Sequence, residues 1–184
     1  MFNLRLGAGL LALVLVNVTM AAPPAVAASK AEINRDVDSA LDILYAKDPD
    51  ARTLANRAKA VLVFPSIVKA GFMFGAQYGE GALREKGRTV GYYNTASASY
   101  GLQAGVQVFG YALFFMTDSA VQYLSKSGGF ELGVGPSIVV LDAGAAKALT
   151  TTTAQKDMYA IFFNQKGLMA GLGLQGTKIS RIEK

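Results

Sequence analysis

The chain contains no cysteine and no histidine among its 184 residues. No disulfide can form, and the Ser-His-Asp and Cys-His arrangements of nucleophilic enzymes are excluded. Zinc sites of the usual kinds, which use Cys or His ligands, are excluded as well. Any enzyme built on this sequence would depend on carboxylate, lysine, tyrosine or serine side chains. We therefore expect a protein that is not an enzyme and that has no metal ion and no cofactor.

The first 27 residues have the features of a secretory signal peptide. Arg5 is the only charged residue before Lys30, and residues 6–16 are almost wholly apolar. Small residues at Ala25-Val26-Ala27 are suited to cleavage. The apolar stretch is short for a membrane span, and an uncleaved N-terminal anchor is the alternative. We expect a signal peptide over residues 1–27 and a single domain over residues 28–184, periplasmic or secreted, with peripheral membrane association as an option.

The charge balance is modestly positive, because 18 Lys and Arg side chains exceed 13 Asp and Glu side chains, for a net charge of +5. Positive charge favours anionic partners. An exported protein is not expected to meet nucleic acid, so an anionic membrane surface is the more natural partner. Tryptophan, which is typical of membrane interfaces, is absent.

Two helices are predicted after the leader. Residues 29–46 have apolar side chains at three- and four-residue spacing, with Ser29 as N-cap and Glu32 completing a capping box. The apolar positions are Ile33, Val37, Ala40, Leu41 and Leu44. Asp50 is predicted to cap a second, shorter helix that extends to about Lys59.

From residue 60 the pattern favours strands. Residues 60–64 are predicted as a short strand that a proline ends, and residues 97–116 are long for one strand. Residues 117–126 are predicted as a short helix capped by Thr117 or Asp118. A final hairpin is expected to pair residues 158–163 with 168–174 across the intervening turn.

These elements predict an α+β fold. A hairpin is expected around Glu85-Lys86-Gly87. The expected architecture is a strongly coiled, mostly antiparallel sheet or barrel-like core of about seven to eight strands, with two N-terminal helices and one inserted short helix.

Three segments repeat a glycine, a large apolar residue, two further residues and a second glycine: residues 71–77, 101–107 and 167–173. With the period of two of a strand, each segment has one apolar face, predicted to be core, and one face of mainly glycine with glutamine or methionine. Glycine in a strand costs about 0.5–1 kcal/mol relative to alanine. The repetition indicates that the glycine face curls the sheet or admits another surface closely. In the first two segments the predicted core residues include Phe72, Phe74, Ala76, Tyr78, Leu102, Ala104, Val106 and Val108.

Two other interpretations, a membrane helix and a carboxylate enzyme, fit the sequence less well. The uncharged residues 89–117 have the length of a membrane helix, but their Tyr, Asn and Gln side chains would lie in hydrocarbon, so alternating strands fit better. Glu80, Asp118, Glu131 and Asp142 are the candidates for carboxylate chemistry. No two of them are predicted to converge, and Glu80 is expected to be a polar turn residue.

Basic side chains gather loosely in the first half of the domain. If they share one face, each contributes about 1 kcal/mol toward an anionic bilayer. The alternative is a set of scattered, solvated surface charges. The candidate lipid-binding residues are Arg52, Arg57, Lys59, Lys69, Arg84, Lys86 and Arg88.

Several motifs occur in the order found in one known family. They are residues 58–65 (AKAVLVFP), 69–72 (KAGF), 100–107 (YGLQAGVQ), 133–136 (GVGP) and 166–171 (KGLMAG), with glycines at 75, 79 and 81. The chain resembles the SYLF domain in these motifs, and the similarity spans roughly residues 51–182.

The resemblance implies lipid binding. Eukaryotic relatives join this domain to SH3 or FYVE modules and associate with phosphoinositide membranes and actin. Because this chain is expected to be exported, actin association is not expected here. The leading hypothesis is a non-enzymatic, exported protein that binds anionic phospholipid headgroups. The alternatives are a structural or scaffolding envelope protein without a specific lipid ligand and, third, a carboxylate enzyme.

Overall fold

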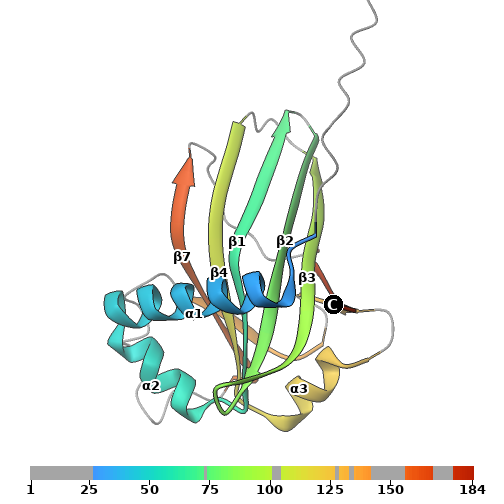
Figure 1. Ribbon diagram of the computed structural model, residues 1–184. Coiled ribbons are helices and arrows are strands. Elements are labelled where there is room, and N and C mark those ends of the chain that lie inside the picture. The colour runs from blue at the N-terminus through green and yellow to red at the C-terminus, as the bar shows by residue number, and fades with distance from the viewer. Residues whose placement is uncertain are drawn as a thin grey trace, which may run out of the picture.

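The computed structural model describes residues 27–72, 74–100, 105–126, 129–132, 135–141, 156–167 and 176–184. Residues 1–26, which make up almost all of the predicted signal peptide, lie outside the described part of the chain. The described residues form three helices and eight strands (Figure 1). They are α1 (Lys30–Lys47), α2 (Pro49–Arg57), β1 (Ala60–Phe72), β2 (Phe74–Glu85), β3 (Arg88–Tyr100), β4 (Gly105–Phe115), α3 (Asp118–Leu124), β5 (Phe130–Glu131), β6 (Ile138–Leu141), β7 (Met158–Gly167) and β8 (Lys178–Ile182).

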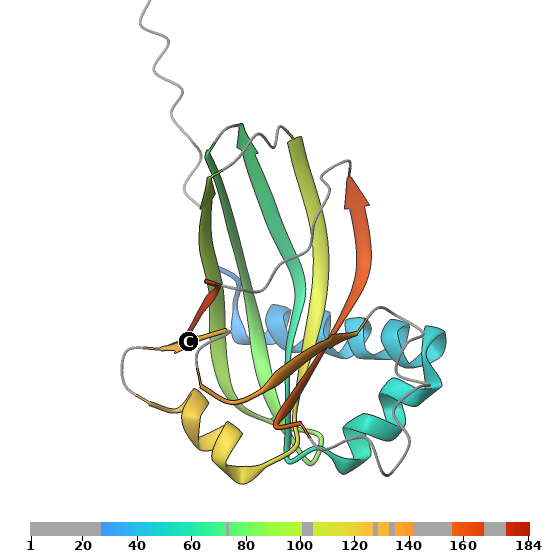
Figure 2. The ribbon, with the colours of Figure 1, turned by 180° about the vertical axis from the view of Figure 1, so that it is seen from behind.

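The strands form one sheet in the order β5-β8-β3-β2-β1-β4-β7-β6. Every pairing is antiparallel except β6 with β7, which is parallel. The sheet curls into a half-barrel, and its β7–β6 edge turns back across the lower part of the strands (Figure 2). The predicted α+β class and the predicted helices and strand number are confirmed.

The sheet has a hydrophobic core on each side. We call the side on which α1 and α2 pack the outer face, and the opposite side, on which α3 packs, the inner face. The outer core joins the helices to the lower strands through Val37, Leu44, Val63, Phe114 and Tyr159. The inner core is aromatic and includes Leu62, Phe64, Tyr111, Phe115 and Phe162, with Tyr111 packed against the rings of Phe64 and Phe162.

Helix α1 begins as predicted. The Ser29 hydroxyl accepts a hydrogen bond from the Glu32 backbone, and the Glu32 carboxylate accepts one from the Ser29 backbone, so the capping box is confirmed. The predicted cap of α2 is wrong: Asp48, not Asp50, accepts the hydrogen bonds of the Asp50 and Ala51 backbones. Pro49 is the first helical residue, where a missing N–H costs nothing, so the cap lies one residue before it.

Strand β1 does not end at its proline. It continues to Phe72, and its register shifts against both neighbouring strands around Pro65, which marks a β-bulge. Gly81 and Gly110 lie opposite this bulge on β2 and β4. A Cβ at Gly81 would overlap the Val63 carbonyl, and one at Gly110 would overlap the Phe163 ring. These two glycines allow the strands to approach closely at the bulge.

The first glycine repeat does not form a single strand. Gly71 at the end of β1 pairs with Gly75 of β2, and Phe72 pairs with Phe74, so the two strands form a tight antiparallel hairpin whose ends meet within the repeat. Its apolar residues beyond the turn are not core either, because Phe74, Ala76 and Tyr78 are exposed. The structure instead buries Gln77.

The structure also differs from the sequence prediction at residues 97–116 and after residue 163. Residues 97–116 belong to two strands, β3 and β4, which are separated in the sheet by β2 and β1. The expected turn after residue 163 is part of β7, where Asn164 has a left-handed φ of 54° at a register shift against β4. Residues 101–104 and 168–175, which hold most of the second and third repeats, lie outside the described residues. Within the described chain, none of the helices has the length and apolar character that crossing a membrane requires.

Candidate functional site

A groove lies between the two N-terminal helices and the lower end of β1 and β2, and its volume is about 560 Å³. Four of the seven predicted basic residues line it: Arg52, Lys59, Arg84 and Lys86. Asp38 and Asp42 of α1 line it as well, so the groove holds four cations and two carboxylates. We call it the basic groove. Its volume is within the range of about 300–1,000 Å³ that is usual for small-ligand sites.

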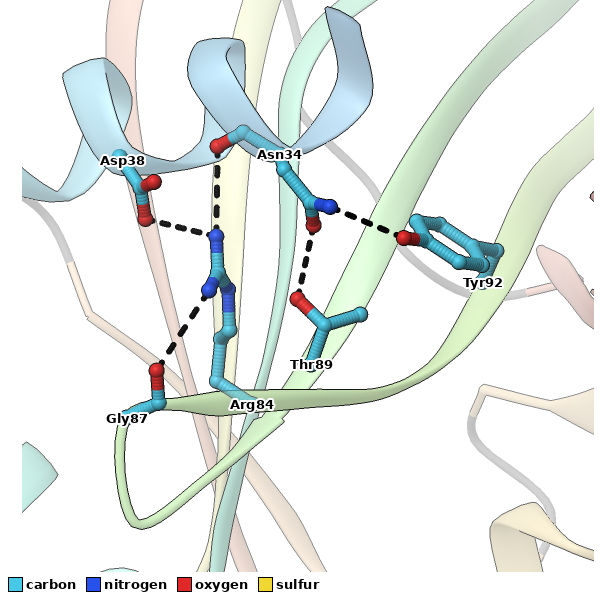
Figure 3. A network of polar contacts seen from close by, with 6 residues as sticks. All are labelled: Asn34, Asp38, Arg84, Gly87, Thr89 and Tyr92. Atoms are coloured by element: carbon cyan, nitrogen blue, oxygen red, sulfur yellow. Dashed lines mark hydrogen bonds and ion pairs between the residues drawn. The ribbon is translucent and has the colours of Figure 1, made fainter. Parts of the chain in front are cut away.

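Arg84 is the cation that the surrounding structure engages most fully (Figure 3). Its guanidinium donates to the Asp38 carboxylate at 2.6 Å, to the Asn34 carbonyl at 3.2 Å and to the Gly87 carbonyl at 3.5 Å. The Asn34 side chain continues the network, accepting from the Thr89 hydroxyl at 2.7 Å and donating to the Tyr92 hydroxyl at 2.9 Å. Arg84 thus connects α1 to the β2–β3 hairpin, which gives it a structural role beside the predicted binding role.

The other three cations of the basic groove are more exposed. Arg52 lies over the Tyr45 ring, with its guanidinium carbon 4.9 Å from the ring centroid. Burial raises the pKa of Tyr45, and the Arg52 charge opposes part of that rise. Lys59 forms an ion pair with Asp118 at 3.5 Å, and both side chains are more than half exposed, so this contact contributes little energy. Lys86 lies in the hairpin turn with a φ of 48°.

The remaining three predicted residues lie elsewhere. Arg57 ends α2 on the surface, and Arg88 begins β3 opposite Glu85. Lys69 lies on β1 between Gln77 and Gln107, in register with both, on the inner face. The seven residues therefore do not form one surface. The structure brings four of them together and leaves three apart.

The polar row around Lys69 was not predicted. Gln77 and Gln107 are both buried, and Gln77 donates to the Thr177 hydroxyl at 3.2 Å. Farther down the inner face, Thr95 and Tyr111 share a buried hydrogen bond of 2.8 Å. The sequence does contain a signal for this polar row: in the first two glycine repeats, a glutamine follows the second glycine by two residues. The prediction places both glutamines on the glycine-rich face of the strand, and it takes the other face as core.

Above α1 the outer face carries exposed apolar side chains. Val68, Tyr78 and Val108 are in register across β1, β2 and β4, and Ala70, Ala76 and Val106 form the next row. Phe74 stands at the top of β2. In Figure 1 the upper parts of these strands rise beyond α1, which crosses only their lower halves. The predicted core assignment of Val106 is wrong for the same reason as that of Tyr78: the helices stop short of these rows.

The carboxylates considered for catalysis are separated. Glu80 accepts from Lys184 at 2.8 Å and from the Tyr78 hydroxyl at 2.9 Å, and Lys184 also donates to the Ala28 carbonyl at 2.8 Å. Desolvation raises the pKa of Tyr78, and its hydrogen bond to Glu80 adds to the rise. Glu80 is thus part of a strand and of a nearly buried ion pair rather than a turn.

The other three candidate carboxylates do not form a site with Glu80. Asp118 opens α3 after the cap residue Thr117, and Glu131 is exposed on β5. Asp142 lies outside the described residues. In the described part of the chain, no group of three or more acidic side chains is placed to hold a metal ion.

Residues 96–184 match the family described as Ysc84, Las17-binding protein actin regulator. No curated protein matches the chain. The matched segment begins within β3 and includes β4 to β8, whereas all the residues of the basic groove precede it.

Proposed function

We propose that this chain binds anionic phospholipid headgroups at a membrane surface. The match of residues 96–184 to the Ysc84 (SYLF) domain family supports this proposal, because that family consists of non-catalytic binding domains and is linked to lipid binding. The proposal assigns the headgroup to the basic groove. Arg52, Lys59 and Lys86 supply the charge, and Arg84 holds the groove in shape.

The observation that supports this proposal is the meeting of four predicted basic residues in one concave site. They come from α2, from the residue that precedes β1 and from the β2–β3 hairpin, so the fold and not the local sequence brings them together. Asp38 reduces the positive charge but is already paired with Arg84 at 2.6 Å. A phosphate group in the groove would therefore meet a net positive charge.

We further propose that the protein acts outside the cytoplasm, in the periplasm or as a secreted protein. The composition of residues 1–27 supports this location. Headgroups with additional phosphates, such as those of phosphoinositides, should bind more tightly than phosphatidylglycerol because each phosphate adds negative charge to the same site.

Co-sedimentation with vesicles tests the proposal. The protein is mixed with vesicles of phosphatidylcholine alone or with added phosphatidylglycerol, and binding is expected only to the anionic vesicles. The combined variant Arg52→Gln, Lys59→Gln, Lys86→Gln should bind more weakly, by on the order of a hundredfold if each cation contributes about 1 kcal/mol. The matched control Lys126→Gln, Lys156→Gln, Lys178→Gln removes the same charge from exposed positions outside the groove.

Two results would contradict the proposal. Equal sedimentation with neutral and anionic vesicles would exclude electrostatic headgroup binding. Equal weakening by the groove variant and its control would show that only the net charge matters. A complete absence of vesicle binding would favour the alternative, a structural or scaffolding envelope protein without a specific lipid ligand.

A further inference from the structure

The upper outer face of the sheet is a continuous apolar surface. Its most exposed members are Phe74, Val106, Tyr78 and Val68, with 70%, 59%, 51% and 49% of their surface accessible. Ala70 and Ala76 lie between them in register and are also exposed. We call these six residues the apolar face. At about 4.8 Å between strands and 3.3 Å per residue, it extends about 10 Å across β4, β1 and β2 and about 13 Å along them.

This arrangement differs from scattered exposed side chains. Single apolar residues are common on protein surfaces, but a contiguous apolar area marks an interaction site. The six residues include no charged and no strongly polar side chain, and the four large ones present about half or more of their surface to solvent. Covering them would be favourable, because full burial of a large apolar side chain stabilises by about 1.5–3 kcal/mol and these four have about half or more of that surface still to bury.

The charges around the apolar face favour an anionic partner. Below it, Glu80 is paired with Lys184 and Asp36 with Arg35, so these carboxylates are neutralised locally. At its β7 side, Lys166 is in register with Val108 and is exposed, and Lys47 at the end of α1 reaches Asn164 of the same strand. In the described chain, neither lysine has a carboxylate within ion-pair distance. The β7 side of the border is therefore positive, while the centre is uncharged.

We propose that the apolar face inserts into the interface of a phospholipid bilayer, with Phe74 entering the acyl region and Lys47 and Lys166 facing anionic headgroups. This inference rests on the proposed lipid-binding function and adds a second contact to it. Phe74 stands at the β1–β2 hairpin, at the end of the sheet away from α2 and the β2–β3 hairpin, so it reaches a flat surface before the helices do (Figure 1). Tyr78, with its hydroxyl bound to Glu80, has the apolar ring and polar end that suit the headgroup level.

A bilayer fits these features better than a second copy of the chain. A second copy docked face to face would present the same uncharged centre and the same lysines, rather than negative charge opposite them. A membrane supplies an apolar interior and, with anionic lipids, the opposite charge at the border. Interfacial binding also combines two weak contributions, apolar insertion and electrostatic attraction, neither of which is strong alone.

A tryptophan at position 74 gives a direct test, since the natural chain has none. The Phe74→Trp protein is titrated with vesicles of phosphatidylcholine and phosphatidylglycerol, and its fluorescence is recorded with and without brominated acyl chains. We expect a blue shift and quenching by the brominated chains. Val140→Trp is the control, because Val140 is 48% exposed but is in register with Ala160 of the inner core.

A second pair of variants measures the binding itself. Phe74→Ser with Val106→Ser should weaken vesicle binding by about tenfold or more, since two large exposed apolar groups are lost. Val90→Ser with Val140→Ser, at 42% and 48% exposure, should leave it unchanged. All four positions are exposed, so the urea midpoints of both variants should stay near that of the wild type.

The outcomes separate the two proposals. If the wild type binds anionic vesicles but the Phe74→Trp protein shows neither shift nor quenching, insertion is wrong and the headgroup proposal stands. If the wild type binds no vesicles, both are wrong. If the fluorescence of Phe74→Trp is shifted without vesicles and the shift grows with protein concentration, the occupant is a second copy and the bilayer assignment is wrong.

Discussion

Replacing Arg84 by methionine separates its two possible roles, headgroup binding and attachment of α1 to the β2–β3 hairpin. Methionine keeps most of the apolar stem and removes the guanidinium. The Arg84 side chain is only 13% exposed, and it donates to Asp38, to the Asn34 carbonyl and to the Gly87 carbonyl. If these bonds are its main role, the substitution should act on stability first and on lipid binding second.

The expected loss of stability follows from these contacts. Asp38 is 63% exposed, so its ion pair is screened and contributes about 0.2–1 kcal/mol. The bond to the Asn34 carbonyl is charge-assisted and partly buried, and it contributes about 1.5–3 kcal/mol. Against this, Arg84 Nε is buried without a partner, a penalty of about 1–3 kcal/mol that the methionine removes. The midpoints of these opposing ranges leave a net fall of about 1 kcal/mol in the free energy of unfolding.

Urea unfolding and vesicle co-sedimentation on the same samples measure the two roles. Lys86→Met is the matched control, because Lys86 lines the same groove but is exposed. We expect Arg84→Met to lower stability more than Lys86→Met and to lower vesicle binding less. Asp38→Asn should destabilise the wild type but have almost no effect in the Arg84→Met background, with a coupling of about 0.5–1 kcal/mol. Unchanged stability together with a large loss of vesicle binding would refute the structural role.

Two further predictions concern other parts of the fold. Glu80→Gln should lower the free energy of unfolding by about 2–4 kcal/mol, because it leaves the nearly buried Lys184 ammonium without the carboxylate that lies 2.8 Å away. Adding Lys184→Met should restore part of the lost stability. A Glu80→Gln protein with the urea midpoint of the wild type would contradict this prediction. The second prediction is a loss of stability in alkali. Burial raises the pKa of Tyr111 in the folded state above its value in the unfolded chain. The contribution of the neutral Tyr111 to the free energy of unfolding is therefore complete below the ordinary tyrosine pKa of about 10 and is lost as pH rises beyond it. Tyr111→Phe with Thr95→Val, which removes both partners of the buried bond, should reduce the fall in urea midpoint above pH of about 10, and an undiminished fall would count against the assignment.

The parts of the fold that depend on neighbours in sequence could be predicted. The capping box of α1 needs only Ser29 and Glu32, three residues apart. The β2–β3 turn needs Lys86 and Gly87 in left-handed conformations, and the glycine there signals the turn. The predicted cap of α2 was wrong by two residues because two aspartates, Asp48 and Asp50, flank Pro49, and the preference of proline for the first helical position, which places the cap at Asp48, was not used.

The first glycine repeat shows where local patterns become ambiguous. Its turn is flanked by Phe72 and Phe74, and it has no Asn, Asp or Pro to mark a reversal of the chain. Continuous alternation therefore favoured a single strand. Alternation does divide a strand into two faces correctly, but it does not say which one is buried. That depends on where α1 crosses the sheet, which is set by contacts with β1 and β2 far along the chain.

The candidate site was predicted in composition but not in arrangement. Arg52, Lys59, Arg84 and Lys86 were singled out by charge, and the fold brings these four together. Nothing near Arg84 in the sequence indicates that Asp38, 46 positions away, would pair with it. The apolar face was missed because large apolar residues in a strand are usually core, and the rule fails where a sheet extends beyond the helices that cover it.

The basic groove and the apolar face differ in whether any of their residues lie in the segment that matches the family. Residues 96–184 contain Val106 and Lys166, which belong to the apolar face and its border, but none of the cations of the basic groove. If the binding property of the family resides in the matched segment, this chain shares it through β4 and β7, which supply Val106 and Lys166, whereas β1 and β2 with the rest of the apolar face precede that segment. The groove would then supply the part of the binding that depends on headgroup charge, while insertion through β1, β2 and β4 would supply a part that does not depend on the headgroup. On this reasoning, serine substitutions at Phe74 and Val106 should reduce binding to anionic vesicles of every headgroup type, whereas the groove variant should change the preference among headgroups.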